Sequence, residues 1–212
     1  MSMTSSKSKE SEMQNIENEK ESAMSKQTKL TLQVSGSAIF AALSITLSWL
    51  ATVLPRFGAG MAYFDPISII WITAFLIFGP WAGILCSIIG TLGLFFFDPF
   101  VPIGPLMKFA ATVILMVVYI IGLKLYKENT TSKKLKNLKT FAIWGIIAIV
   151  IRVILMVLLN IPAYLIIAGT SEGLVLWLIN AIITNSYQGF ADLVIPYLLV
   201  YKTKLDEKFE IW

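Results

Sequence analysis

Residues 63–97 read YFDPISIIWITAFLIFGPWAGILCSIIGTLGLFFF, a long apolar run that is broken at Gly79-Pro80. A helix needs roughly 20 apolar residues to cross a bilayer core about 30 Å thick, with a range of about 17–25. Proline lacks a backbone N–H and disfavours helix in the residue before it, so Gly79-Pro80 indicates a tight turn. The run therefore predicts two membrane-spanning helices, over residues 63–79 and 81–97.

Four further apolar segments of spanning length flank this pair, at residues 32–54, 102–123, 140–160 and 174–200. The last exceeds one bilayer thickness, so we expect it to be tilted or to extend past the interface. The predicted fold class is all-α, an integral membrane six-helix bundle that forms one membrane domain over residues 30–204.

The two ends of the chain are polar. Residues 1–29 contain five lysines and five glutamates and no apolar run, which predicts a disordered cytoplasmic tail. A cleavable signal peptide would place its apolar stretch much nearer the start, so we expect the first span to be retained. Residues 205–212 are expected to form a short cytoplasmic C-terminal tail.

The composition excludes several classes of protein. Hydrophobic residues make up 57% of the 212 residues and charged residues 14%, against about 45–50% and about 25% in soluble domains. An ordinary soluble domain, a disordered chain and a basic nucleic-acid binder are therefore excluded. The sequence has no histidine and one cysteine, Cys86, which excludes an internal disulfide and His-based or Cys-cluster metal sites.

The placement of lysine and arginine predicts the orientation, because cytoplasmic loops of membrane proteins carry an excess of both. Six spans place three basic segments on one side: Lys26 and Lys29, then Lys124, Lys127, Lys133, Lys134, Lys136 and Lys139, then Lys202, Lys204 and Lys208. The opposite loops contain only Arg56 with Asp65, then Asp98, then Glu172. We therefore expect a multi-pass protein of the cell membrane with both termini in the cytoplasm.

Polar residues inside the spans are candidates for function, because a charge at the bilayer centre costs about 2.5–3.5 kcal/mol on insertion scales. Asn185, Gln188 and Asp192 are spaced by three and four residues and share one helix face. Hydrogen bonds between helices are the alternative role for them. Lys108 either contributes to a site or extends its side chain outward to the interface. Arg152 is predicted to pair with Asp192 as a structural charge pair.

Aromatic, amide and proline residues gather where the spans reach the outer side. Rings with a few polar groups suit a flat organic ligand, so we expect a pocket that is open to the outside. The alternative is the aromatic belt found at any membrane interface. The candidate binding residues are Tyr63, Asp65, Phe97, Asp98, Gly104, Lys108, Asn160, Tyr164, Asn185 and Gln188.

The first span has a face of small residues. Ala38 and Ala42 are four residues apart and would let another helix approach closely, either within the bundle or from another membrane subunit.

Sequence motifs of the common catalytic and nucleotide-binding sites are missing. The sequence contains no GxxxxGK[ST] phosphate loop, no GxSxG and no HExxH.

Several of these residues resemble a known family. The stretch Asp65-Pro66 through Leu76-Ile77-Phe78-Gly79-Pro80-Trp81-Ala82-Gly83, followed by Pro102-Ile103-Gly104-Pro105, is similar to the substrate-binding S components of energy-coupling-factor (ECF) vitamin importers. The riboflavin-type members look closest. They share the Gly-Pro-x-Ala-Gly turn, the Pro-Ile-Gly loop and an Ala-x-x-x-Ala face on the first span. The resemblance covers about residues 32–204.

This resemblance implies a six-helix substrate-capture subunit that has no enzymatic activity and no cofactor of its own. Its partners would be a membrane coupling subunit, docked at Ala38 and Ala42, and two cytoplasmic ATPases that use the ATP. The ligand would be a vitamin, with riboflavin as the leading candidate, and its pocket would be built by the later spans and the outer loops. A nucleic acid is not among the expected partners.

Two departures from the family pattern keep other ligands open. Riboflavin-type members carry Asn a few residues after Pro-Ile-Gly, where this chain has Lys108, and Asn-x-x-Lys-Gly in the last span, where it has Asn185-Ser186-Tyr187-Gln188-Gly189. A lysine suits a carboxylate or phosphate, so a different, anionic vitamin or precursor is an alternative.

Other classes of function are less well supported by the sequence. A stand-alone permease is the alternative of a different class, although we find no internal repeat of the kind many secondary transporters have. A membrane enzyme would lack histidine and paired carboxylates for acid–base chemistry. A purely structural or regulatory membrane protein is the remaining alternative.

Overall fold

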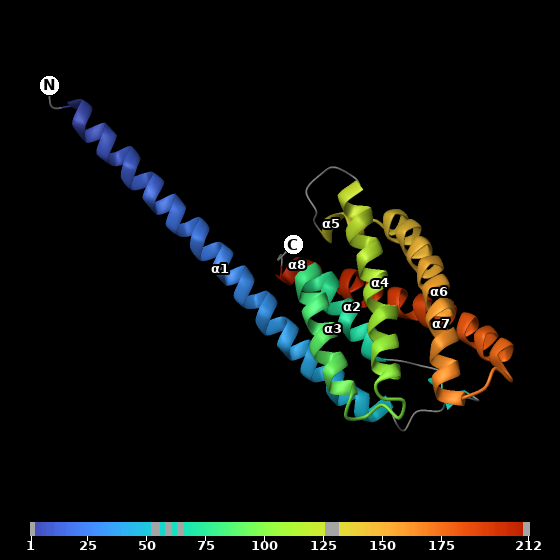
Figure 1. Cartoon of the computed structure of the whole chain (residues 1–212). Coiled ribbons are helices and arrows are strands. Elements are labelled where there is room, and N and C mark those ends of the chain that lie inside the picture. The colour runs from blue at the N-terminus through green and yellow to red at the C-terminus, as the bar shows by residue number, and fades with distance from the viewer. Residues whose placement is uncertain (1–2, 52–55, 58–60, 63–65, 126–131, 210–212) are drawn as a thin grey trace.

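The computed structural model describes the backbone of residues 3–51, 56–57, 61–62, 66–125 and 132–209, and side chains within residues 25–49, 66–125 and 134–209. Helices make up nearly all of the described chain (Figure 1). In order, the elements are α1 (Met3–Ala51), β1 (Arg56–Phe57), β2 (Met61–Ala62), α2 (Pro66–Phe78), α3 (Pro80–Leu94), α4 (Ile103–Leu125), α5 (Ser132–Leu135), α6 (Leu138–Ala168), α7 (Leu174–Tyr197), the π-helical turn η1 (Leu198–Lys202) and α8 (Leu205–Phe209).

The predicted all-α bundle is confirmed. The six helices α1, α2, α3, α4, α6 and α7 lie where the six spans were predicted. Within the described residues, Ser25–Trp49, Ile103–Leu125 and Leu138–Ala168 are long and apolar enough to cross a membrane, and α2 and α3 are shorter apolar helices. The short antiparallel pair of β1 and β2, with Arg56 opposite Ala62, was not predicted.

The first helix is longer than the predicted span. Residues 1–29 were expected to be disordered, whereas α1 is helical from Met3 and continues without interruption to Ala51. Residues 1–35 contain no proline or glycine, and the five Lys, five Glu and four Met of residues 1–29 have good helix propensity. The polar composition of residues 1–29 predicts that this segment has no apolar core to pack into. It contains nothing that would end a helix, so α1 continues through it.

The fifth predicted span is also longer in the structure. It was expected to end at residue 160, near Pro162, but α6 continues through this proline to Ala168. Its end is set by Gly169, which has a left-handed φ of 66° and whose N–H bonds to the carbonyl of Leu165. Glycine accepts this conformation without the penalty that a Cβ would bring, which makes it the usual helix terminator.

The helices pack as two connected groups. α1 lies against α2 and α3, α4 contacts both α3 and α6, and α6 packs along α7. α2 contacts α7 as well as α1 and α3, so it joins the two groups (Figure 1). Large side chains of α2 fill the core, among them Trp71 and Phe75, which are fully buried. Trp71 fits there because Gly90 on α3 leaves no Cβ in the space of its indole ring.

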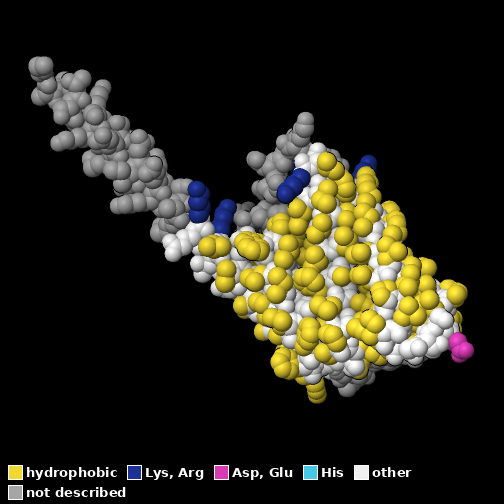
Figure 2. Space-filling model, viewed as in Figure 1, with side chains coloured by type: hydrophobic (Ala, Val, Ile, Leu, Met, Phe, Trp, Pro, Cys, Tyr) yellow, Lys and Arg dark blue, Asp and Glu magenta, His cyan; other side chains and the backbone are white. Residues whose placement is uncertain are grey.

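The bundle has two chemically different ends. One end carries the α2–α3 turn, α5 and α8, together with the basic segments; we call it the basic end (Figure 1). The other end carries the α3–α4 loop and the α6–α7 turn, with Phe95, Phe96, Phe97, Tyr164 and Trp177; we call it the aromatic end. Apolar side chains cover the face between the two ends, and lysine or arginine side chains lie toward the basic end (Figure 2).

An apolar surface of this kind is what a bilayer requires. On α6, Ile146, Val150, Ile154 and Leu158 form a row in which each residue is more than half exposed. The spacing of four residues places them on one helix face. Soluble monomers rarely expose so large an apolar patch, whereas lipid tails cover such a face without cost.

Candidate functional site

A pair of buried charges lies between α6 and α7. Nη1 of Arg152 is 2.6 Å from Oδ2 of Asp192, and both side chains are 2% exposed. This charge pair was predicted from the sequence. Burial in an apolar bundle makes the loss of one partner expensive, because the remaining charge would have neither water nor a counter-charge. The pair therefore links α6 to α7 within the core of the bundle.

The same arginine also holds an amide. Nε of Arg152 donates a hydrogen bond to Oδ1 of Asn185 at 3.3 Å, and Nδ2 of Asn185 donates to the carbonyl of Ala181 at 2.9 Å. These two bonds orient the Asn185 side chain. An amide has two N–H donors and two acceptor lone pairs, so among the described residues one donor and one acceptor of Asn185 remain for another group.

Two hydroxyl residues that were not predicted from the sequence, Ser68 and Thr112, complete the cluster. The Ser68 hydroxyl on α2 and the Lys108 ammonium group on α4 both favour the negative charge of the Asp192 carboxylate. Oγ1 of Thr112 lies 3.1 Å from Oγ of Ser68 and 3.0 Å from the carbonyl oxygen of Lys108. We call Ser68, Lys108, Thr112, Arg152, Asn185 and Asp192 the buried polar cluster.

The buried polar cluster joins four helices, α2, α4, α6 and α7. Each contributes at least one polar side chain to a region that is otherwise apolar. Gln188 is half-buried on α7 and lies one turn from both Asn185 and Asp192, on the same face. The arrangement brings together Lys108, Arg152, Asn185, Gln188 and Asp192 from the sequence prediction, and it can offer donors, acceptors and charge to a ligand.

Two other predicted residues meet at the aromatic end of α6 and α7. Nε1 of Trp177 donates a hydrogen bond of 2.8 Å to Oδ1 of Asn160, which is buried. The ring of Tyr164 lies 5.2 Å from the ring of Trp177, and its hydroxyl donates to the carbonyl of Glu172. Asn160 and Tyr164 thus close the α6–α7 turn, and Trp177, which was not among the predicted binding residues, holds the Asn160 side chain by this hydrogen bond.

The α3–α4 loop brings together a second part of the predicted set. Oδ1 of Asp98 accepts a 2.7 Å hydrogen bond from the N–H of Phe100, and the Asp98 carboxyl packs directly on Gly104. A side chain at Gly104 would collide with that carboxyl. Phe97 lies next to them and is 36% exposed. The loop also contains a cis peptide bond between Val101 and Pro102.

The remaining predicted residues lie elsewhere or outside the described residues. Ala38 and Ala42 on α1 are exposed, whereas the inward face of this helix carries Ser37, Ala41 and Ser44. Tyr63 and Asp65 lie outside the residues that the structure describes. The predicted outer pocket would border on them, so its full outline is also outside the described part.

Thr112 and Ser68 were not predicted, and the sequence contains a signal for only one of them. Thr112 follows Lys108 by four residues, so a shared face on α4 could have been inferred. Ser68 carries no such signal, because nothing in the sequence indicates that α2 packs against α7.

A metal site is not indicated: the described residues contain no group of three or more Cys, Asp or Glu side chains that could hold an ion.

Comparisons with known proteins agree with this architecture. A sequence model of the family described as "ECF-type riboflavin transporter, S component" matches residues 29–205. A solved structure described as the S component of a bacterial ECF transporter is similar in fold, with a TM-score of 0.66 and 20% sequence identity. The alignment covers 84% of this chain and 98% of that one. No curated protein matches the sequence.

Proposed function

Because the chain belongs to the family of ECF-type riboflavin transporter S components, we propose that it captures riboflavin at the extracellular side of the membrane. Membership makes it a membrane-embedded, substrate-binding transporter subunit and not an enzyme. It also implies a vitamin as substrate and an ECF module of coupling and ATPase subunits as partners. The family match over residues 29–205 is the observation that carries the proposal.

The proposed orientation has both termini in the cytoplasm. The basic end then faces the cytoplasm, in agreement with the positive-inside rule, and the aromatic end faces outward. Riboflavin would enter from the aromatic end, between α4, α6 and α7 and the loops. We propose that the binding residues are Tyr63, Asp65, Phe97, Asp98, Gly104, Lys108, Asn160, Tyr164, Asn185 and Gln188.

The chemistry of the buried polar cluster supports a flavin ligand. Riboflavin presents a flat ring with carbonyl and N–H groups and a chain of hydroxyls. Asn185 retains one donor and one acceptor after its bonds to Arg152 and Ala181, which suits a ring edge that has both kinds of group. Aromatic residues at the same end of the bundle would supply stacking surfaces.

A titration of the purified chain with riboflavin tests the proposal. Flavin fluorescence should be quenched to saturation by the chain alone, without partners or ATP. Asn185→Ala should weaken binding about tenfold, because it removes a hydrogen bond in a buried site. Gln188→Ala should also weaken binding.

Ser186→Ala is the matched control for these variants. Ser186 lies next to Asn185, but its hydroxyl bonds to the carbonyl of Ile182 on its own helix, on the exposed side of α7. Its riboflavin affinity should equal that of the wild type. Full riboflavin affinity in Asn185→Ala would remove α7 from the proposed pocket, and a chain that does not quench flavin at all would refute the riboflavin assignment.

Lys108 favours a second candidate, an anionic vitamin or precursor. Lys108 is a half-buried member of the buried polar cluster, and its positive charge favours the ionised form of Asp192. An ammonium donates three hydrogen bonds and carries a full charge, which suits a carboxylate or phosphate. Competition would separate the two candidates: an anionic vitamin that displaces bound flavin, and whose affinity falls in Lys108→Gln more than that of riboflavin, would favour this second ligand.

We further propose that the face around Ala38 and Ala42 docks on the coupling subunit. Both residues are exposed, and small side chains allow close approach of another helix. Ala38→Trp and Ala42→Trp should block copurification with the coupling subunit and leave riboflavin affinity unchanged. Val175→Trp, at an exposed site on α7, is the control. A complex that still forms with tryptophan at both alanines would disprove the docking proposal.

A further inference from the structure

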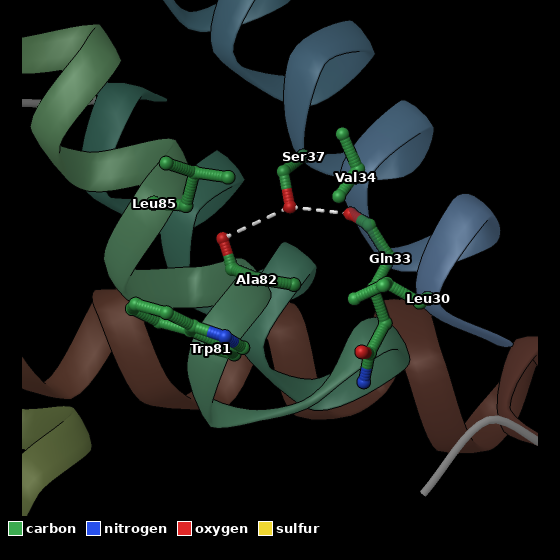
Figure 3. Close-up of a pocket in the computed structure, with 7 residues that line it drawn as sticks. All are labelled: Leu30, Gln33, Val34, Ser37, Trp81, Ala82 and Leu85. Atoms are coloured by element: carbon green, nitrogen blue, oxygen red, sulfur yellow. Dashed lines mark hydrogen bonds between the residues drawn. The ribbon is translucent and has the colours of Figure 1, made fainter. Parts of the chain in front are cut away.

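A groove lies between α1 and α3 at the basic end, away from the buried polar cluster. Its volume is about 170 Å³, and its walls are mostly apolar, with Leu30 and Val34 on α1 facing Trp81 and Leu85 on α3 (Figure 3). Val34 is 51% exposed and Trp81 is 68% exposed, so the groove opens to the surface of the bundle. In a bilayer this surface is in contact with lipid.

The base of the groove is polar. Nε2 of Gln33 donates a 2.8 Å hydrogen bond to the carbonyl of Phe78, at the α2–α3 turn. The Ser37 hydroxyl lies 2.5 Å from the carbonyl of Gln33 and 3.3 Å from that of Ala82 (Figure 3). The described residues provide no further partner for the Gln33 amide, so its Oε1 and its second N–H can bond to a group that enters the groove.

Two lysines lie on α1 one helical turn before the residues that line the groove. Lys29, Gln33 and Ser37 are spaced by four residues, and so are Lys26, Leu30 and Val34, so each α1 stripe that lines the groove begins at a lysine. Four residues of helix correspond to about 6 Å along the axis. Both lysines are exposed, and basic side chains are visible where the described part of α1 approaches the bundle (Figure 2).

We propose that this groove holds one acyl chain of an anionic phospholipid, whose phosphate lies at Lys26 and Lys29. Three features of this region match the three parts of a phospholipid in order. The apolar walls suit the acyl chain, the Gln33 amide suits the ester groups, and the lysines suit the phosphate. Trp81 fits the same position, because tryptophan favours the boundary between headgroups and acyl chains.

The selectivity of this site comes from the headgroup. The surrounding bilayer is as apolar as the groove, so an acyl chain gains little hydrophobic free energy by entering it. Each lysine near an anionic lipid increases the affinity about fivefold. The site should therefore prefer an anionic lipid over a zwitterionic one by about 25-fold, and the preference should depend on both lysines.

Native mass spectrometry of the full chain tests the headgroup part. The protein in detergent is given equal amounts of phosphatidylglycerol and phosphatidylcholine. We expect one retained phosphatidylglycerol and a loss of the preference, by about 25-fold, in Lys26→Gln/Lys29→Gln. Lys202→Gln/Lys208→Gln removes the same charge from another exposed part of the basic end and should retain the preference. Equal retention of both lipids by the wild type, or an equal loss in the control, would overturn the proposal.

A second variant tests the groove itself. Val34→Trp fills it from α1, and we expect it to release the lipid, whereas Ile39→Trp places the same ring at a site on α1 that is 66% exposed and outside the groove. Retention of phosphatidylglycerol by Val34→Trp would overturn the proposal. If that lipid-retaining variant also failed to assemble with the coupling subunit or with a second copy of the chain, the groove would be a protein interface.

Discussion

The two groups of helices use buried polar residues in different ways. In α1, α2 and α3 these residues are mainly hydroxyls that bond to a carbonyl of their own helix, as Ser48, Thr73 and Thr91 do. In α6 and α7 they are charges and amides that bond from one helix to the other, as Arg152 does with Asp192. Most buried hydroxyls of the first group are therefore satisfied within their own helix, with Ser37 and Ser68 as exceptions, while the second group depends on the exact pairing of its helices.

This difference separates two roles within one bundle. Small residues such as Gly90 and Ser44 let α1 and α3 approach α2 closely around Trp71, which produces a tightly packed unit that can present an outer face to other subunits. The charged and amide residues of α4, α6 and α7 instead concentrate hydrogen-bonding capacity at one place. A ligand site needs the second arrangement, and a docking surface needs the first.

The largest effect should come from breaking the buried charge pair. Arg152→Met leaves the Asp192 carboxylate without its counter-charge and should lower the free energy of unfolding by about 3–5 kcal/mol. Unfolding of the detergent-purified protein, by heat or by SDS, measures the loss. The double variant Arg152→Met/Asp192→Leu should recover part of it, because neither charge is then left alone.

A hydroxyl in the other group provides the comparison for this pair. Ser87→Ala removes a hydroxyl that bonds at 2.8 Å to the carbonyl of Ile84 on its own helix. Its loss should lower the free energy of unfolding by about 1 kcal/mol or less. If Ser87→Ala and Arg152→Met were equally destabilising, the proposed contrast between the two helix groups would be lost.

The next effect tests close packing in the first group. Gly90→Val places side-chain atoms where the Trp71 indole and the Ser44 hydroxyl lie, and should lower the free energy of unfolding by about 1–3 kcal/mol. Riboflavin affinity measured on the folded fraction should be retained. Ala38→Val enlarges an exposed site on α1 and should be neutral. A loss of riboflavin affinity in Gly90→Val would show that the two groups are not separate in function.

A smaller effect is expected at the aromatic end. Trp177→Phe keeps a ring beside Tyr164 but removes the donor to the buried Oδ1 of Asn160, and should lower the free energy of unfolding by about 1 kcal/mol. Trp81→Phe is the matched control, because the Trp81 ring is 68% exposed. Equal stability of Trp177→Phe and the wild type in the same unfolding assay would contradict the role of this hydrogen bond.

The smallest effect concerns the link between α8 and the segment before α6. Nζ of Lys136 lies 2.7 Å from Oε1 of Glu207 and 3.1 Å from Oδ2 of Asp206. The hydrogen bond to Lys136 lowers the pKa of Glu207, and the bonds to Glu207 and Asp206 raise the pKa of Lys136. The pair is exposed, so its contribution to stability is small.

The pKa directions give this contribution a defined pH window. It is lost in acid as the pH falls through the lowered pKa of Glu207, and in alkali as the pH rises through the raised pKa of Lys136. Tm of the wild type should therefore exceed that of Glu207→Gln near neutral pH, with a difference that shrinks toward both extremes and in high salt. A Tm difference that is constant from acid to alkaline pH would argue against this ion pair.

The sequence predicted the fold where a local signal was strong. Gly79-Pro80 marks the turn between α2 and α3 because its backbone cannot continue a helix, and Gly79 has a φ of 99° in the structure. The predicted end of α6 at residue 160 was wrong because the local signal there was weak. Pro162 breaks an isolated helix pattern, but here the helix continues to Gly169, as proline is often tolerated within membrane helices.

The site was predictable only in part. Asn185, Gln188 and Asp192 share a helix face because of their spacing, and this spacing can be read from the sequence alone. The contacts of Ser68 and Thr112 with the cluster depend on how α2 and α4 pack against α7, and one sequence does not contain that information. The exposure of Ala38 and Ala42 likewise depends on which face of α1 turns inward.

Mass spectrometry of the small molecules extracted from the purified chain tests the central claim most directly. Prepared from riboflavin-containing cells without partner subunits, the wild type should release riboflavin in near-equal molar amount, and Asn185→Ala should release much less. Extraction of a different vitamin, or of no bound metabolite from a folded preparation, would contradict the claim that α4, α6 and α7 form a riboflavin site.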